Sequence, residues 1–178
     1  MPRIVLICNE ANQGRVAARR ARTDEVLSQK CKYALRALLV LAREQDQDVL
    51  LIGDIAEREH LPKKFLEAIL LELKRHGIVR SRRGRGGGYA LAKPADVITF
   101  GQVVRLMDGP LAPTPCTSVN FYQRCTDCPD EAQCEIRRVM RRVREAIANT
   151  LDHTTLKDAL GAGRGEAAAA AADTMIAK

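Results

Sequence analysis

Four cysteines crowd into one segment of the chain, and their thiols are the groups best suited to chemistry. They are Cys116, Cys125, Cys128 and Cys134. Thiolates are the soft ligands that zinc and iron–sulfur clusters share, and either group needs several of them to converge within a few ångströms. The segment is too polar to be core, which argues against ordinary buried cysteines. The pattern predicts a metal site, but the spacing does not separate a cluster from zinc.

A switch without metal is the alternative chemistry of the same segment. Cys125 and Cys128 have the Cys-x-x-Cys spacing that also occurs in pairs that form and break a disulfide. Two further cysteines are not candidates for a site. Cys31 is expected to pack within a helix, and Cys8 has no assignable role.

The second candidate site is a run of arginines and glycines between two short segments of strand character. Residues 82–88 contain three arginines and four glycines, which predicts a hairpin with a flexible basic tip. Arginine offers bidentate donors to phosphates and guanine edges, and glycines let the backbone approach a duplex closely. The run matches neither the dinucleotide-binding nor the P-loop pattern. We therefore expect Arg80, Arg82, Arg83 and Arg85 to contact DNA. The alternative is a run of charges that is simply exposed to solvent.

Helix signals in front of this hairpin predict the elements that position it. Apolar residues at helical spacing indicate a first helix over about residues 28–43. Asp54 and Glu57 resemble a capping box that starts a second helix. Pro62 suits the first turn of a third helix, which Gly77 ends. Two helices joined by a short turn form a helix-turn-helix, and the hairpin behind them is then its wing.

The third helix has an exposed face that suits the major groove. The N-terminal part of a recognition helix meets the base edges, and the outward residues there are Lys63, Lys64 and Glu67. The predicted fold class is mainly α with a small β wing, a winged helix-turn-helix domain followed by a long C-terminal dimerisation helix.

Two more helices follow the wing. Thr99 and Gln102 form a capping box, and the helix that it starts ends at Gly109. Later, apolar residues recur at spacings of three and four, with arginines on the other faces. This pattern predicts a dimer seam made of Ile136, Val139, Met140, Val143 and Ile147.

Length and charge set the outer limits of the interpretation. A chain of 178 residues holds one compact domain plus an attached helical segment. Its net charge of +7 favours an acidic partner such as nucleic acid. No apolar run reaches the roughly 20 residues that cross a bilayer. No nucleophile, base and orienting partner occur together, so we expect no enzyme activity.

The expected organisation follows from these segments. A basic leader covers residues 1–25, and the winged domain covers residues 26–109. The cysteine-rich loop covers residues 110–134, the dimerisation helix residues 131–151, and a C-terminal helix with an Ala-rich tail residues 152–178.

The combination of these motifs resembles a known family over about residues 26–160. Four motifs carry the resemblance: the run from Leu27 to Leu38, the Asp54 helix, the Arg-Gly-Gly-Gly-Tyr-Ala-Leu wing, and a cysteine cluster before a long helix. Together they are similar to the IscR/NsrR type of bacterial regulator, the Rrf-two family. The resemblance implies a cytoplasmic homodimer that binds near-palindromic double-stranded operator DNA, usually as a repressor. It also implies sensing of iron, redox state or nitric oxide through a [2Fe–2S] or [4Fe–4S] cluster.

The resemblance also implies a ligand set, from which this sequence departs. Cys128 and Cys134 match the family's last two ligands, and the first is Cys116 or Cys125, of which we favour Cys116. The family's fourth ligand, a histidine or an acidic residue, falls on Arg137 or Lys32 here. Cys125 is therefore a candidate to complete a site of four cysteines. Three alternatives remain: a structural zinc site, the thiol switch, and an adaptor that acts through protein contacts.

Overall fold

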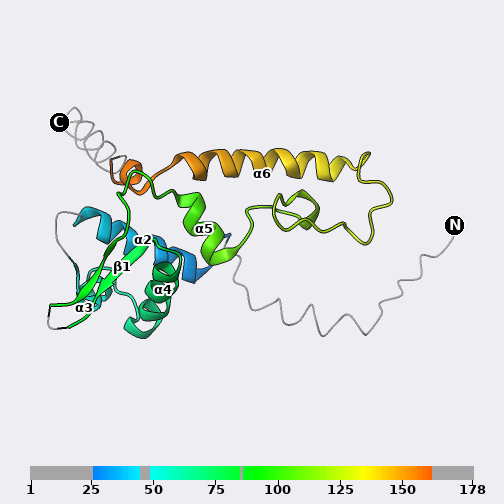
Figure 1. Cartoon of the computed structure of the whole chain (residues 1–178). Coiled ribbons are helices and arrows are strands. Elements are labelled where there is room, and N and C mark those ends of the chain that lie inside the picture. The colour runs from blue at the N-terminus through cyan, green and yellow to red at the C-terminus, as the bar shows by residue number, and fades with distance from the viewer. Residues whose placement is uncertain (1–25, 45–48, 85, 162–178) are drawn as a thin grey trace, which may run out of the picture.

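The computed structural model describes residues 26–44, 49–84 and 86–161, and it is mainly helical with one small sheet (Figure 1). The predicted leader, Arg85 in the wing and the Ala-rich tail lie outside the described residues. The elements run in the order α2 (Gln29–Arg43), α3 (Ile52–Arg58), α4 (Lys63–Arg75), β1 (Val79–Arg82), β2 (Gly88–Leu91), α5 (Phe100–Asp108), the short 3₁₀ helix η2 (Pro115–Thr117) and α6 (Glu135–His153). This order confirms a mainly α fold with a β wing.

Helix α2 forms the centre of the hydrophobic core. The Ser28 side chain accepts a hydrogen bond from the Cys31 amide at 3.1 Å and so caps the helix where the sequence indicated its start. Leu38 and its buried neighbours on α2 face α4 and α5. Cys31 itself is fully buried, as expected for a small packing residue.

The helix-turn-helix consists of α3, a tight turn and α4. The predicted capping box at Asp54 and Glu57 is wrong, because α3 begins earlier, with Leu51 at its N-cap. Asp54 lies within the first turn of α3, where its negative charge favours the helix N-terminus without capping it, and the next residue, Ile55, is fully buried. The turn then places His60 at a φ of 50°, in the left-handed region.

The wing is an antiparallel hairpin in which Val79 pairs with Leu91 and Arg82 with Gly88. Leu50 extends this sheet, because it exchanges two backbone hydrogen bonds of 2.8 Å with Tyr89. A Cβ at Gly88 would lie 2.3 Å from the Leu50 carbonyl oxygen, so only glycine allows this approach.

The chain leaves the winged domain after α5 and returns to it at the end of α6 (Figure 1). Thr99 caps α5 through a hydrogen bond from the Gln102 amide at 3.2 Å, as the sequence predicted. Beyond α6, the Leu156 amide donates to the Ile98 carbonyl at 3.0 Å, and the Leu156 side chain is fully buried in the core. The sequence-based division left residues 152–178 outside the winged domain, whereas the chain rejoins that domain at Leu156.

Candidate DNA interface and cysteine site

Helix α4 presents a basic exposed face at its N-terminal end. Leu66, Ile69, Leu70 and Leu73 turn into the core. The predicted contact residues Lys63, Lys64 and Glu67 are exposed on the opposite side. This is the arrangement that an amphipathic recognition helix requires, because the buried stripe fixes which side chains face outward.

The wing is held beside α4 by a side-chain contact. Lys74 Nζ donates to Ser81 Oγ at 2.7 Å, which ties the end of α4 to β1. Of the predicted wing residues, Arg80, Arg82 and Arg83 are all exposed. One of them also closes the tip, since Arg82 Nη2 donates to the Gly86 carbonyl at 3.0 Å.

At the tip of the wing, the backbone around Gly87 is packed so closely that only glycine fits there. The Gly87 amide donates to the Gly84 carbonyl at 2.9 Å. A Cβ on Gly87 would lie 2.4 Å from the Arg82 carbonyl oxygen. The absence of a side chain at Gly87 therefore lets the two sides of the wing come close together beside the exposed Arg82 and Arg83.

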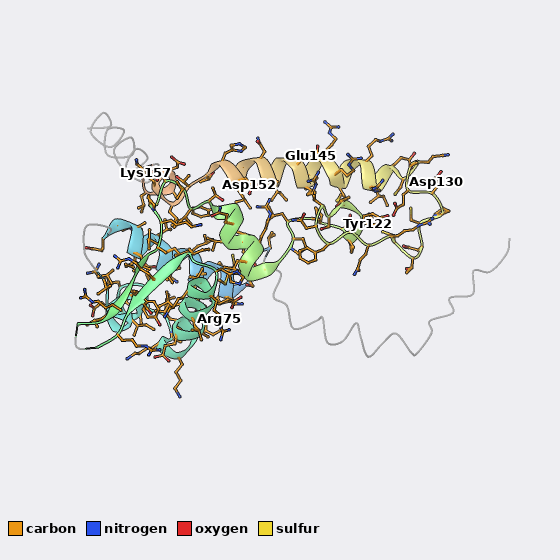
Figure 2. The ribbon with its side chains drawn as sticks, viewed as in Figure 1. Arg75, Tyr122, Asp130, Glu145, Asp152 and Lys157 are labelled. Atoms are coloured by element: carbon orange, nitrogen blue, oxygen red, sulfur yellow. The ribbon has the colours of Figure 1, made fainter. Side chains whose placement is uncertain are left out.

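The segment of residues 109–134, here called the cysteine loop, runs beside α6 and away from the lobe that contains α4. Figure 2 shows Tyr122 and Asp130 on this loop, well apart from Arg75 at the end of α4. Cys134 is the N-cap of α6, and its Sγ accepts a hydrogen bond from the Arg137 amide at 3.4 Å. Arg137 Nε donates to the carbonyl of the buried Cys116 at 3.2 Å. Arg137 thus joins the two ends of the loop.

The four predicted cysteines stand as two neighbouring pairs. A hydrogen bond with Cys116 is the largest of the effects that raise the pKa of Cys125 to about 11. Desolvation is the largest cause that raises the pKa of Cys128, and a hydrogen bond with Cys134 is the second. The charge of Cys128 also acts on Cys125, so the pairs adjoin.

The donors of the cysteine loop suit a soft metal centre in kind, but they do not converge. Within the described ranges, no three His, Cys, Asp or Glu side chains are placed to hold a metal ion. Four thiols in one loop, with a rigid helix start at one end, are nevertheless the donor chemistry that iron–sulfur clusters and zinc use. The residues present therefore fit such a group in type, and binding would require the two pairs to close together.

Sequence reasoning missed the contacts that brace this loop. Tyr122 Oη donates to Glu131 Oε2 at 2.6 Å, and Arg137 Nη2 lies 4.0 Å from the same oxygen. Glu131 lies midway between Cys128 and Cys134 in the sequence. This position was the sequence signal that could have indicated its contact with the cysteine loop. Arg137, noted only because it replaces a family ligand, holds the loop together.

The end of α6 is fastened to α5 by a bidentate ion pair. Arg105 donates to the two carboxylate oxygens of Asp152 at 2.5 and 2.8 Å, and this bonding lowers the pKa of Asp152. Gly101 lies directly under the pair, since a Cβ there would be 1.9 Å from Asp152 Oδ1. The orientation of α6 is therefore set by contact with the winged domain.

The apolar stripe predicted on α6 is exposed over part of its length, whereas Met140 and Ile147 are half-buried. None of the residues of this 19-residue helix is buried. Ile136, Val139 and Val143 are 69%, 51% and 39% exposed. In the described part of the chain, no helix is both long enough and apolar enough to cross a membrane. Exposed apolar side chains at this helical spacing, such as Ile136, Val139 and Val143, suit contact with another protein surface.

Comparison with known proteins assigns the family. Residues 27–162 match the model of the family Rrf2, described as an iron-dependent transcriptional regulator. The chain belongs to the Rrf2 family. The chain is thus a transcriptional regulator and not an enzyme, and the resemblance found from sequence is confirmed.

Similar proteins place this Rrf2 regulator among helix-turn-helix regulators. An rrf2-like regulator of Rhodobacter capsulatus is 48% identical over 141 residues, which are 78% of this chain and 94% of the relative. IscR of Erwinia tasmaniensis is 32% identical over 132 residues, which are 74% of this chain and 76% of the relative. The solved structure of CymR, the global cysteine regulator of Bacillus subtilis, aligns with a TM-score of 0.63 at 30% identity. The alignment covers 75% of this chain and 95% of the CymR chain.

Proposed function

We propose that this Rrf2 regulator is a cytoplasmic homodimer that represses genes by binding near-palindromic operator DNA. Its DNA affinity responds to a metal centre held by Cys116, Cys128 and Cys134, with Cys125 as a further ligand. The observation that carries the proposal is the position of Arg137, which bonds both to the Cys116 carbonyl and to the Cys134 end of the loop. A change in the position of the thiols therefore moves Arg137 and the start of α6.

The DNA-binding part of the proposal is supported by two surfaces of one lobe. The start of α4 supplies Lys63, Lys64 and Glu67 to the major groove, and the wing supplies its arginines to the phosphate backbone. The Lys74–Ser81 bond joins the end of α4 to β1 and so links the two surfaces. We include Arg85 in the wing contacts on sequence grounds alone.

The dimer is supported by the exposed stripe on α6. Two copies of this stripe, packed against each other, remove the apolar side chains of Ile136, Val139 and Val143 from water. Such a pairing sets two winged domains on successive half-sites of one duplex.

Communication between the two sites follows the chain of contacts through α6. The first turn of α6 is bonded to the cysteine loop by Arg137, and its last turn is bonded to α5 by the Arg105–Asp152 pair. A shift of α6 therefore changes the angle between the dimer seam and the winged domain. Control of DNA binding requires that the two angles fit the operator differently.

We favour an iron–sulfur cluster as the metal centre because the matching family is described as iron-dependent and IscR is among the relatives. When bound, a cluster supplies a centre that reacts with oxidants and nitric oxide. The pairing of the thiols supports a second candidate, a metal-free thiol switch, and CymR is named as a cysteine regulator. The interactions that raise the thiol pKa values join Cys116 with Cys125 and Cys128 with Cys134, so we infer a switch through these pairs, with Cys125 and Cys128 as the other pair to test.

Anaerobic purification followed by absorption spectroscopy and analysis of iron, sulfide and zinc tests the proposal. We expect a coloured protein that contains iron and sulfide, and a change in operator affinity when the cluster is removed. A colourless protein with stoichiometric zinc would refute the cluster. A metal-free protein whose operator affinity changes only when thiol pairs oxidise would establish the thiol switch instead.

A further inference from the structure

A pocket of about 310 Å³ lies along the N-terminal half of α6, and arginines make up half of its lining residues. These arginines are Arg137, Arg138, Arg141 and Arg142. Pockets that hold small molecules have volumes of about 300–1,000 Å³, so this pocket is at the lower end of that range. Its size therefore suits a small ligand, and its lining suits an anion.

The two carboxylates beside the pocket do not neutralise all of its positive charge. Glu145 is paired with Arg144, whose Nη2 lies 3.0 Å from Glu145 Oε1. Glu131 has Arg137 as its cation, at 4.0 Å. Three of the lining arginines form no ion pair within 4.0 Å in the described part of the chain, and they are Arg138, Arg141 and Arg142. These three charges remain available to a ligand.

The spacing of the three arginines brings their guanidinium groups to one side of α6. Arg138 is three residues before Arg141 and four before Arg142, so the three are neighbours on the helix surface. Like charges at these spacings destabilise a helix, and a bound anion offsets that repulsion. Guanidinium groups donate paired hydrogen bonds to phosphate oxygens, and a phosphoryl group carries a charge of about −1.5 to −2 at pH 7. Phosphate is therefore the anion that matches both the charge and the donor geometry.

We propose that this pocket binds a small anion that carries phosphoryl groups. The site is separate from the surfaces of the proposed function. Figure 2 shows Glu145, which lines the pocket, well apart from Arg75 at the end of α4, so the pocket is not part of the proposed DNA surface. The exposed apolar residues of the proposed dimer seam, Ile136, Val139 and Val143, do not line it either.

Isothermal titration calorimetry of the full chain at constant ionic strength tests this proposal. The probes are inorganic phosphate, pyrophosphate and ribose 5-phosphate, which separate free phosphates from a phosphate ester. We expect saturable binding of at least one probe, with one site per chain. R141Q should weaken that binding by at least about tenfold, because it removes charge-assisted hydrogen bonds. R141K keeps the positive charge and should recover part of the lost affinity.

Two controls separate a phosphate site from general attraction of anions. R75Q removes an exposed arginine on α4 and should bind the probe like the wild type. Citrate carries a similar charge on carboxylates and should not displace the bound probe at equal concentration. Displacement by citrate, or equal weakening by R75Q and R141Q, would overturn the proposal.

The remaining outcomes are equally direct. Absence of saturable binding of any probe to the wild type, or equal affinities of the wild type and R141Q, would also overturn the proposal. Circular dichroism and the thermal midpoint of each variant show whether the fold is kept, and recovery by R141K cannot come from a misfolded chain. The measurement requires neither metal nor operator DNA, so its failure would leave the proposed function unaffected.

Discussion

Replacement of Gly101 by alanine tests whether the Arg105–Asp152 pair sets the junction between α5 and α6. The added Cβ would lie 1.9 Å from Asp152 Oδ1 and 2.8 Å from Arg105 Nη1. The first distance is far inside van der Waals contact, so the carboxylate must move and the bidentate geometry is disrupted. The helix backbone of α5 cannot give way easily, because Val103 and Val104 next to it are buried in the core.

The expected change in the free energy of unfolding follows from two destabilising effects and one stabilising effect. The ion pair has side chains 37% and 39% exposed, and solvent screening limits its contribution to about 1 kcal/mol. Overpacking at the junction adds roughly 1–3 kcal/mol of destabilisation. Alanine in place of glycine inside a helix returns about 1 kcal/mol through its higher helix propensity. We expect G101A to lower the free energy of unfolding by about 1–3 kcal/mol in total.

The decisive measurement is the same substitution in a D152A background, followed by urea unfolding of all four proteins. Without the carboxylate, the 1.9 Å clash is gone, and the end of the Arg105 side chain, no longer held by the ion pair, can move away from the added Cβ. Only the propensity gain then remains, so G101A should stabilise by about 0.5–1 kcal/mol. The sign of the effect should therefore reverse. Equal effects of G101A in both backgrounds would refute the reasoning. Operator binding should weaken in the G101A single variant if the junction orients the winged domain.

Further predictions concern the wing, the acid stability and the dimer seam. Replacing Arg82 and Arg83 with alanine should weaken operator binding and reduce the slope of log affinity against log salt by about 0.9 for each phosphate that the variant no longer neutralises; an unchanged slope in a gel-shift salt series would contradict the role of the wing. Because bonding to Arg105 lowers the pKa of Asp152 in the folded chain, its stabilisation is present above the ordinary carboxyl pKa of about 3.9 and disappears as pH falls through the lower folded value. Urea unfolding below pH 5 should therefore show a smaller acid-dependent decrease in stability for D152N than for the wild type, and identical profiles would exclude this contribution. The proposed homodimer through α6 predicts that the wild type is dimeric in light scattering at micromolar concentration, that V139D is monomeric, and that R141Q behaves like the wild type; a dimeric V139D would contradict a seam at Val139.

Local sequence signals were sufficient for most of the helices. Ser28 caps α2, Thr99 caps α5, and Gly77 and Gly109 adopt the positive φ angles that end a helix, as their residue types indicate. These features depend on neighbours within one turn, so they can be predicted without the fold. Two helix starts differ from the expectation: α3 begins before the cap offered by Asp54, and α6 begins at Glu135 and not at residue 131, because Cys134 is its N-cap.

The sequence by itself thus determined the winged helix-turn-helix, the basic wing and the cysteine-rich loop, because periodicity, caps and charge are short-range properties. Only the tertiary structure decided which distant residues meet. Arg105 and Asp152 are 47 residues apart, and Arg137 and Cys116 are 21 residues apart. Their contacts arise because the cysteine loop runs out from α5 and α6 runs back, which also returns Leu156 to the core. The path of the chain is set by packing of whole helices, and no local pattern encodes it.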